Sequence, residues 1–176
     1  MIKGENVNLR PICKEDFDLI YTWNTNQEYL GKYMDAEMRV KDSALADMER
    51  AVASNRISFF IIEDKEGRAI GIINYLNSMA TTEAYDFGIL VANNDKKGKG
   101  VGTEALNLFI DYIFNTKNIM RLQFITRSDN YGMKKLGEKS GFTLEGTLRK
   151  YKFENGDYRD YCLYGIIRDD WRKLIK

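Results

Sequence analysis

The sequence of 176 residues contains no histidine, only two cysteines and a single proline. Without histidine, the most common general base is missing, and neither a Ser-His nor a Cys-His nucleophile can form. The same absence excludes a metal site of the Cys/His type, and Cys13 and Cys162 are too few for a disulfide framework. We therefore expect no bound metal, and we expect any catalytic group to be a carboxylate or a tyrosine.

Long hydrophobic runs and a surplus of one charge are also absent. No stretch of about 18 apolar residues is present, so no membrane span is expected. The start, Met1–Glu5, is not followed by the apolar region of a signal peptide, which makes the cytoplasm the expected location. Lysine and arginine number 27 against 26 aspartates and glutamates, a balance that argues against a protein that coats nucleic acid.

The pattern of apolar residues predicts short strands with helices inserted at intervals. The single proline and the lack of a Gly/Ser-rich linker favour one domain over residues 1–176. Because strands dominate, we expect an α/β (α+β) fold in which helices cover a mixed sheet. The expected strands are 7–10, 57–63, 69–76, 82–91, 122–126, 143–150 and 159–166, and the expected helices are 15–24, 27–33, 43–54, 130–140 and one that ends at 115.

A basic, glycine-rich segment is the most informative feature that the sequence does contain. A glycine-rich turn that opens a helix directs unpaired main-chain N–H groups and the positive end of the helix dipole toward one point. Such a point binds phosphate, so the segment predicts a cofactor that carries a pyrophosphate. The segment lies between the apolar run 87–91 and an amphipathic helix pattern, and it reads Lys96-Lys97-Gly98-Lys99-Gly100-Val101-Gly102-Thr103.

The spacing of the glycines narrows the choice of cofactor. A Walker loop ends in Gly-Lys-Ser/Thr, and a Rossmann fingerprint requires Gly-x-Gly-x-x-Gly; neither is present, and no ATP hydrolysis is expected. The pattern Gln/Arg-x-x-Gly-x-Gly/Ala fits at Gly100 and Gly102, and its first position is Lys97, a conservative departure that keeps the positive charge of arginine. This pattern resembles the acetyl-CoA loop of the GCN5-related N-acetyltransferases (GNAT).

The second half of the chain extends this resemblance. Residues 130–142 are similar to a second GNAT segment, and Asn155-Gly156 is a strong signal for a two-residue hairpin turn. The resemblance runs from Val7 to Trp171, and the branch that it most resembles contains the ribosomal-protein N-terminal acetyltransferases and their small-molecule relatives. It implies a mixed, mostly antiparallel sheet of about seven strands flanked by helices.

The resemblance also implies acetyl-CoA as the co-substrate and assigns its contacts. The pantetheine arm pairs with the end of a strand, here residues 89–91, where a main-chain N–H polarises the thioester carbonyl. The pyrophosphate lies on the main-chain N–H groups of residues 97–102, and the lysines add positive charge. The implied cofactor-binding residues are Ile89, Leu90, Val91, Lys96, Lys97, Gly98, Lys99, Gly100, Val101, Gly102, Thr103 and Asn130.

The sequence departs from the family at two positions that bear on proton transfer. Many members carry a tyrosine that protonates the leaving thiolate, and here that position is Gly137; the family's serine is replaced by Met133. Neither side chain can donate a useful proton. Three explanations stay open: water or a tyrosine of the last strands protonates the thiolate, the enzyme works slowly with deprotonated amine, or the chain binds acetyl-CoA without turnover.

The candidate general base is Asp86, on the strand before the loop, where related proteins carry a glutamate. Partial burial would raise the pKa of such a carboxylate toward a useful range, although an ordinary strand carboxylate is the competing interpretation. Glu28, Tyr33 and Tyr75 are the residues predicted to line the acceptor side.

The predicted function is an N-acetyltransferase that moves an acetyl group from acetyl-CoA to a primary amine by direct attack in a ternary complex. The acceptor is a protein N-terminus or a small amine such as a polyamine, an amino acid or an aminoglycoside, and no nucleic acid or membrane partner is expected. The alternative is a catalytically weak acyl-CoA-binding sensor or interaction protein. Homodimers are common in the family, so a homodimer is one arrangement that the resemblance implies.

Overall fold

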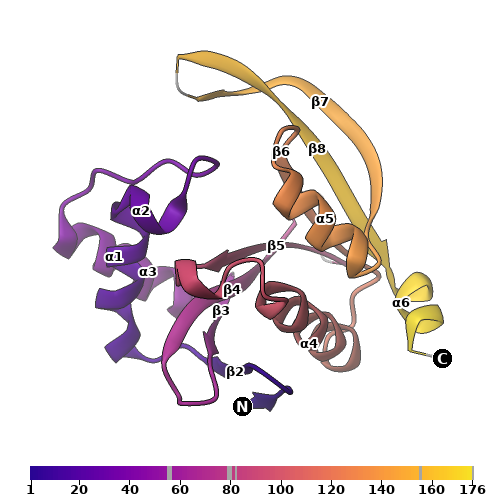
Figure 1. Ribbon diagram of the computed structural model, residues 1–176, viewed down its shortest axis with the longest axis horizontal. Helices are drawn as coiled ribbons and strands as arrows, with labels where there is room; N and C mark the ends of the chain where they lie inside the picture. The colour runs from indigo at the N-terminus through magenta and orange to yellow at the C-terminus, as the bar shows by residue number, and fades with distance from the viewer. Residues whose placement is uncertain (55–56, 79–80, 82, 155, 176) are drawn as a thin grey trace. The chain divides into compact units, whose positions relative to one another are not determined.

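The computed structural model describes residues 1–54, 57–78, 81, 83–154 and 156–175 (Figure 1). Two compact units can be distinguished. The first comprises Met1–Leu76 with Gly88–Phe109, and the second comprises Asn77–Phe87 with Ile110–Lys176. The boundary passes through strand β5 (Ala84–Val91) and helix α4 (Val101–Thr116), so each unit contains part of both elements. It also separates Asn77, the last residue of strand β4 (Ala69–Asn77), from the rest of that strand.

The first unit is built on antiparallel strands in the order β1-β2-β3-β4, with β5 beside β4. Gly71 on β4 allows β5 to approach closely, because a Cβ at this position would collide with the carbonyl oxygen of Leu90. The strands are β1 (Ile2–Lys3), β2 (Asn8–Pro11), β3 (Ile57–Glu63), β4 (Ala69–Asn77) and β5 (Ala84–Val91).

Three helices pack beside these strands: α1 (Phe17–Thr25), α2 (Gln27–Leu30) and α3 (Lys41–Ala53) (Figure 1). A 3-10 turn, Lys14–Asp16, precedes α1. The helices and strands share one hydrophobic core, because buried side chains of α1 and α2 lie against buried side chains of β3, β4 and β5. The core residues are Ile20, Trp23, Leu30, Ile61, Ile72, Leu90 and Ala92.

An ion-pair network joins the start of α1 to the strands. Arg10 on β2 donates to Asp16 Oδ2 and to Glu63 Oε1, each at 2.6 Å. The hydrogen bonds from Arg10 hold the pKa of Asp16 at about 2, below its usual value of 3.8, although burial works in the opposite direction. The 3-10 turn is thereby held against both β2 and β3.

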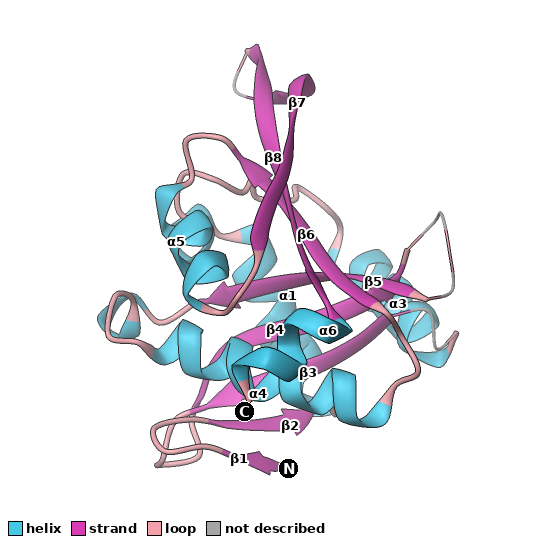
Figure 2. Cartoon of the chain, turned by 90° about the vertical axis from the view of Figure 1, so that its right-hand side faces the viewer, coloured by secondary structure: helices cyan, strands magenta, loops and turns pink. Residues whose placement is uncertain are grey.

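The second unit has the strand order β5-β6-β8-β7, in which β5 and β6 are parallel and the other pairs are antiparallel. The strands β7 and β8 form a long twisted hairpin, and α5 lies along one side of it (Figures 1 and 2). The elements are β6 (Arg121–Arg127), α5 (Tyr131–Lys139), β7 (Thr143–Glu154), β8 (Asp157–Ile167) and α6 (Arg168–Leu174).

Helix α4 (Val101–Thr116) begins in the first unit and ends in the second. Its C-terminal end is closed by Arg168 of α6, whose guanidinium donates to the carbonyl oxygens of Phe114 and Lys117 at 2.7 Å. The ring of Phe114 stacks on Trp171 with centroids 5.3 Å apart. These contacts satisfy carbonyl groups that a helix end leaves without intrahelical partners.

The predicted elements agree with the structure to within a few residues. The strand predicted at 57–63 is β3 without any shift, and the predicted helix that ends at 115 is α4, which ends at Thr116. The structure describes eight strands instead of about seven, because β1 has only two residues, and α6 was not predicted. Thr82, the predicted first residue of β5, and Asn155 of the predicted turn lie outside the described residues.

Among the described helices, none is both long and apolar enough to cross a membrane. The described residues also hold no group of three or more Cys, Asp or Glu side chains arranged to bind a metal ion.

Candidate functional site

The glycine-rich segment forms a loop between a short 3-10 turn, Asn94–Lys96, and the start of α4 at Val101. Gly98 and Gly100 have φ angles of 75° and 84°, in the left-handed region that favours glycine. A Cβ at either position would point into open space. The loop therefore needs glycine for its backbone conformation, and it leaves room beside the first turn of α4, where N–H groups point outward.

The three lysines of the loop, which the sequence presented as equivalent, have different surroundings. Lys96 lies 3.9 Å from Asp64 Oδ2 in the turn between β3 and β4. Lys97 is exposed overall, but its Nζ donates to the carbonyl oxygen of Tyr29 on α2 at 3.2 Å, and desolvation lowers the pKa of its ammonium group. Lys99 is exposed. Each can add positive charge near a phosphate, but Lys96 and Lys97 also anchor the loop to its neighbours.

The residues predicted to pair with the pantetheine arm lie on β5, just before the loop. Ile89 and Val91 are half-buried and Leu90 is buried. Close to them, Gly88 is packed so that a Cβ would lie 3.1 Å from Oδ1 of Asn74 on β4. All predicted cofactor-binding residues except Asn130 therefore belong to the first unit.

Asn130 lies in the second unit, where it is the N-cap of α5. Its Oδ1 accepts from the N–H of Met133, and its Nδ2 donates to Thr126 Oγ1, both at 3.1 Å. An N-cap asparagine stabilises its helix by satisfying an N–H of the first turn. The side chain therefore has a structural role, and its contact with the cofactor stays a prediction.

Gly137, at the position of the family's tyrosine, is buried against Phe124 of β6. A Cβ there would lie 2.6 Å from Phe124 Cζ. The ring of Phe124 cannot easily move, because it stacks on Tyr164 at 5.1 Å and packs edge-on against Phe87 at 5.2 Å. The packing of the Phe124 ring therefore requires glycine at position 137, although the two residues are 13 positions apart in the sequence.

The tyrosines of the last strands have other partners. Tyr164 is buried and donates to Glu138 Oε1 at 3.1 Å, and burial together with this carboxylate raises its pKa to about 12. Tyr161 is also buried and donates to Glu154 Oε1 at 2.6 Å. A tyrosine whose pKa is raised is a weaker acid, so Tyr164 is poorly suited to protonate a thiolate.

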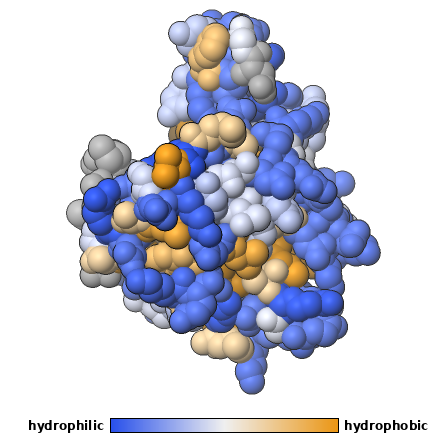
Figure 3. Space-filling view, turned by 90° about the vertical axis from the view of Figure 1, so that its left-hand side faces the viewer, coloured by the Kyte–Doolittle hydropathy of each residue, from blue (hydrophilic) through white to orange (hydrophobic). Residues whose placement is uncertain are grey.

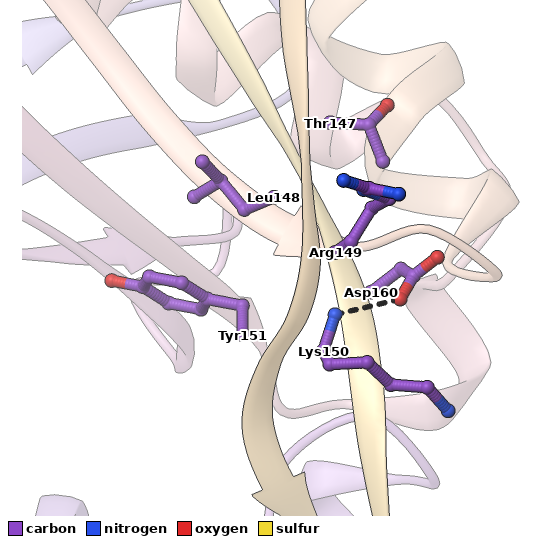
Figure 4. Close-up of a pocket in the computed structure, with 6 residues that line it drawn as sticks. All are labelled: Thr147, Leu148, Arg149, Lys150, Tyr151 and Asp160. Atoms are coloured by element: carbon purple, nitrogen blue, oxygen red, sulfur yellow. Dashed lines mark hydrogen bonds between the residues drawn. The ribbon is translucent and has the colours of Figure 1, made fainter.

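A bulge that the sequence did not predict interrupts β7 beside Tyr161. Lys150 has a φ angle of 52°, and its N–H donates to Asp160 Oδ1 at 2.8 Å. As a result, Leu148 and Tyr151 project to the same side of β7, as Figure 4 shows. The bulge borders a hollow of about 650 Å³ lined by Thr147, Leu148, Arg149, Lys150, Tyr151 and Asp160.

The candidate base, Asp86, is half-buried on β5 in the second unit. Its Oδ1 accepts a hydrogen bond of 2.8 Å from Nε2 of Gln123 on the neighbouring strand β6. Gln123 is not predicted from the sequence, because no local pattern connects two residues 37 positions apart. Its position directly opposite Asp86 follows from the parallel register of β5 and β6.

The predicted acceptor residues lie in the first unit with different degrees of burial. Glu28 is exposed on α2, and Tyr33 is half-buried with the Lys32 ammonium 4.8 Å from its ring centroid. Tyr75 is only 6% exposed, and its ring lies 6.4 Å from Phe60 and 6.2 Å from Phe109. The ring of Tyr75 is thus part of an aromatic core, and its role toward the acceptor stays a prediction.

The segment after α2 carries exposed apolar side chains. Met34, Met38 and Val40 are exposed by 44%, 93% and 75%. Figure 3 views the molecule from the side on which α1–α3 lie and shows apolar side chains among hydrophilic ones. This segment follows the predicted acceptor residues Glu28 and Tyr33, so apolar groups lie next to a carboxylate and a phenol in the sequence.

Comparison with known proteins identifies the class. The sequence matches the acetyltransferase (GNAT) domain over residues 6–143, which is more than half of the chain. The chain therefore belongs to the GNAT acetyltransferase family, as its glycine loop and its second segment predicted. It is an acetyl-CoA-dependent N-acetyltransferase.

Individual relatives are similar over almost the whole chain. The spermidine N(1)-acetyltransferase of Escherichia coli (strain K12) is 28% identical over 162 residues, which cover 91% of this chain and 85% of that protein. The putative ribosomal N-acetyltransferase YdaF of Bacillus subtilis (strain 168) is 25% identical over 153 residues, 83% of this chain and 82% of that protein. A crystal structure of spermidine N-acetyltransferase from Vibrio cholerae, in complex with CoA and spermine, has a TM-score of 0.84 at 22% identity and covers 96% of this chain and 99% of that chain. The predicted fold class is thus confirmed.

Proposed function

We propose that this enzyme acetylates a primary amine of a polyamine or of a similar small cationic amine. The observation that carries the acetyl-donor half of the proposal is the loop 97–102, whose two positive-φ glycines leave open space at the start of α4. The acceptor half is supported by the curated spermidine acetyltransferases, which are similar to this chain over nearly its full length. On the same ground, we propose that residues 1–176 act as one acetyltransferase domain.

The residues of the loop fit the pyrophosphate of acetyl-CoA, which supplies the acetyl group as a thioester. In this proposal, the N–H groups of 97–102 and the Thr103 hydroxyl bind the phosphates. The main chain of Ile89–Val91 pairs with the pantetheine arm, and a main-chain N–H on this strand polarises the carbonyl that the amine attacks. Holding donor and acceptor together in a ternary complex replaces a bimolecular encounter by a reaction between oriented neighbours.

Asp86 is the proposed general base. Through one water molecule, it accepts the first proton of the acceptor's ammonium group, which frees the lone pair of the nitrogen for attack. The new C–N bond then forms, the C–S bond breaks, and the nitrogen releases its second proton to solvent. The departing thiolate takes its proton from water, because Gly137 and Met133 offer no donor and Tyr164 is buried with a raised pKa. The proposal therefore assigns one protein group to proton transfer and leaves the other transfers to solvent.

The experiment below also distinguishes one alternative acceptor and one alternative function from the polyamine proposal. A protein N-terminus is the alternative acceptor, since a putative ribosomal acetyltransferase is also among the relatives. A weakly catalytic acyl-CoA sensor is favoured by one observation, the ring of Phe124 beside Gly137, which occupies the space next to the missing tyrosine. A homodimer is proposed from the family resemblance, and sedimentation of the purified protein tests it.

The decisive experiment measures thiol release from acetyl-CoA with a panel of acceptors, alongside calorimetry with coenzyme A. The panel contains spermidine, spermine, an aminoglycoside, a free amino acid, and peptides that begin with alanine or serine. We expect CoA binding and the highest kcat/KM with a polyamine. Turnover confined to the peptides would overturn the polyamine proposal, and tight CoA binding without any turnover would establish the sensor.

A further inference from the structure

We propose that Gln123 is a positioning residue that holds the Asp86 carboxylate in its proton-accepting form, and that Arg121, Glu145 and Gly165 fix Gln123 in the orientation needed for this task. The inference rests on the proposed role of Asp86 as general base. All of these residues belong to the second unit, and none of the four residues around Asp86 is proposed to contact the reacting atoms.

A continuous chain of hydrogen bonds crosses the sheet from Asp86. Nε2 of Gln123 donates to Asp86 Oδ1 at 2.8 Å, and Oε1 of Gln123 accepts from Nε of Arg121 at 2.5 Å. Arg121 then donates from Nη1 to Glu145 Oε1 at 2.7 Å and from Nη2 to Glu145 Oε2. The chain joins β5, β6 and β7, so no single stretch of sequence contains it.

The direction of the amide follows from these partners. The carboxamide oxygen of Gln123 can accept from Arg121 but cannot donate, so its NH2 group must face Asp86. If the amide turned over, its oxygen would face a carboxylate and its NH2 group would face a guanidinium, and both hydrogen bonds would be lost. Arg121 thus sets the side of Gln123 that Asp86 meets.

Glu145 in turn fixes Arg121. The paired hydrogen bonds between the guanidinium and the carboxylate raise the pKa of Arg121 and lower the pKa of Glu145, so both groups stay charged. The guanidinium of Arg121 on β6 interacts electrostatically with Asp86, and Glu145 of β7 pairs with that guanidinium. The direct hydrogen-bond partner of Asp86 is the neutral amide of Gln123. The charges of Arg121 and Glu145 lie beyond this amide and compensate each other.

Gly165 on β8 provides the room for this chain. It pairs with Gln123 on one side and with Thr143 of β7 on the other. A Cβ at Gly165 would lie 2.6 Å from Arg121 Nη2 and 2.6 Å from Glu145 Oε1. Because Gly165 has no side chain, Arg121 of β6 can reach over β8 to Glu145 of β7.

The arrangement has a direct chemical consequence. A carboxylate accepts a proton only while it is ionised, and a hydrogen bond donated to the ionised form favours that form. Gln123 therefore places a hydrogen-bond donor against the form of Asp86 that can accept the proton of the ammonium group. It also holds one of the two oxygens in place, so the carboxylate plane is oriented before the acceptor binds.

The test compares the pH dependence of kcat/KM for the wild-type enzyme, Gln123→Met and Gln123→Glu, with acetyl-CoA and the best amine acceptor. Methionine keeps the size of the side chain without a donor, so the acidic limb moves upward by about one pH unit. Glutamate places a like charge beside Asp86 and moves the limb further in the same direction. The exposed Lys139→Met, on α5 of the same unit, is the control and keeps the wild-type profile.

Further variants separate a failure of this inference from a failure of the proposed base. Asp86→Asn lowers kcat/KM by at least about 100-fold if Asp86 is the base. Wild-type activity in Asp86→Asn would overturn the role of Asp86 itself. An inactive Asp86→Asn combined with an unmoved acidic limb in both Gln123 variants would leave the base in place and overturn the positioning role.

Gly165→Ala perturbs the same chain of hydrogen bonds through a residue of β8. It keeps the inference testable even if the variants at position 123 do not fold. Its Cβ displaces Arg121 and Glu145, so the acidic limb moves in the same direction by less than in Gln123→Met. Circular dichroism and thermal unfolding establish that each variant is folded. A folded Gly165→Ala with a wild-type pH profile would show that the orientation of Gln123 does not depend on Arg121.

Discussion

The cofactor loop of the first unit is made from consecutive residues, whereas the chain around Asp86 in the second unit joins strands whose contributing residues run from position 86 to position 165. The loop depends on local conformation, since Gly98 and Gly100 adopt φ angles that other residues avoid. The Asp86 chain depends on strand register, since Gln123 meets Asp86 only when β6 pairs with β5. Under the proposed function, binding of the acetyl donor thus depends on local backbone conformation, whereas positioning of the proposed base depends on strand pairing.

The largest effect is expected from a substitution that disrupts the backbone conformation of the glycine-rich loop. Gly100→Val forces a β-branched residue to a φ of 84° and perturbs the N–H groups that we propose bind the phosphates. We expect the Kd for coenzyme A to rise about 100-fold, measured by calorimetry.

Gly67→Val is the matched control for this change. Gly67 has a φ of 76° in the turn between β3 and β4, and a Cβ there also meets open space. It therefore carries the same backbone strain away from the loop, and its Kd stays at the wild-type value. An unchanged Kd in Gly100→Val would remove the loop from the cofactor site.

The second effect tests whether the ion-pair network of Arg10, Asp16 and Glu63 in the first unit, whose members are also far apart in the sequence, stabilises the fold. The folded pKa of Asp16, about 2, lies below its usual value of 3.8, so its stabilisation is present above pH 3.8 and is lost as the pH falls through about 2. Asp16→Asn is expected to lower the free energy of unfolding by roughly 1–2 kcal/mol at pH 7, measured by urea denaturation. The difference from wild type shrinks below pH 3.8.

The exposed Asp18→Asn, on the same helix, serves as the comparison for Asp16. Its carboxylate pairs with Lys41 at the surface, with a side-chain exposure of 69%, so little change in stability is expected. A gap between Asp16→Asn and wild type that persists unchanged down to pH 2.5 would contradict the ion-pair explanation.

The third effect sharpens the account of Gly137. Gly137→Ala gains about 1 kcal/mol of helix propensity but drives a Cβ into Phe124, an overpacking cost of about 1–3 kcal/mol. We expect a net loss of about 1 kcal/mol in urea denaturation, and we expect Phe124→Leu to restore part of it in the double variant.

Gly132→Ala, on the same helix α5, is the control with the opposite sign. A Cβ at Gly132 meets only Asn130 Oδ1 at 3.7 Å, so this variant gains stability from helix propensity. Equal stability changes at positions 132 and 137 would mean that the Phe124 ring does not explain the glycine.

The smallest effect concerns the lysines of the loop. Lys99→Met removes an exposed charge, so the Kd for coenzyme A is expected to rise about threefold at low salt and less at high salt. Lys97→Met also removes the hydrogen bond to the carbonyl oxygen of Tyr29 and is expected to raise the Kd more. A larger effect at Lys99 than at Lys97 would contradict the anchoring role of Lys97.

The same contrast explains which features the sequence predicted. The helix α4 and the strand β3 were predicted because apolar residues recur with a clear local period, and the loop was predicted because its three glycines alternate within one short segment. Gln123 and Gly165 were not, because their roles depend on partners in other strands. Gly137 was noticed as a departure from the family, but its cause, the ring of Phe124, required the packed structure.

The bond from Lys97 to Tyr29 uses a peptide oxygen, an atom that every amino acid supplies at that position. Substitution of the phenol on α2 would therefore leave this attachment available. Since Glu28 of α2 is predicted to line the acceptor side, we expect side chains of this helix to be exchangeable. The preferred amine would then change while the affinity for the acyl donor persists. We expect variants randomised at 28, 29 and 33 to differ in acceptor preference far more than in their affinity for coenzyme A.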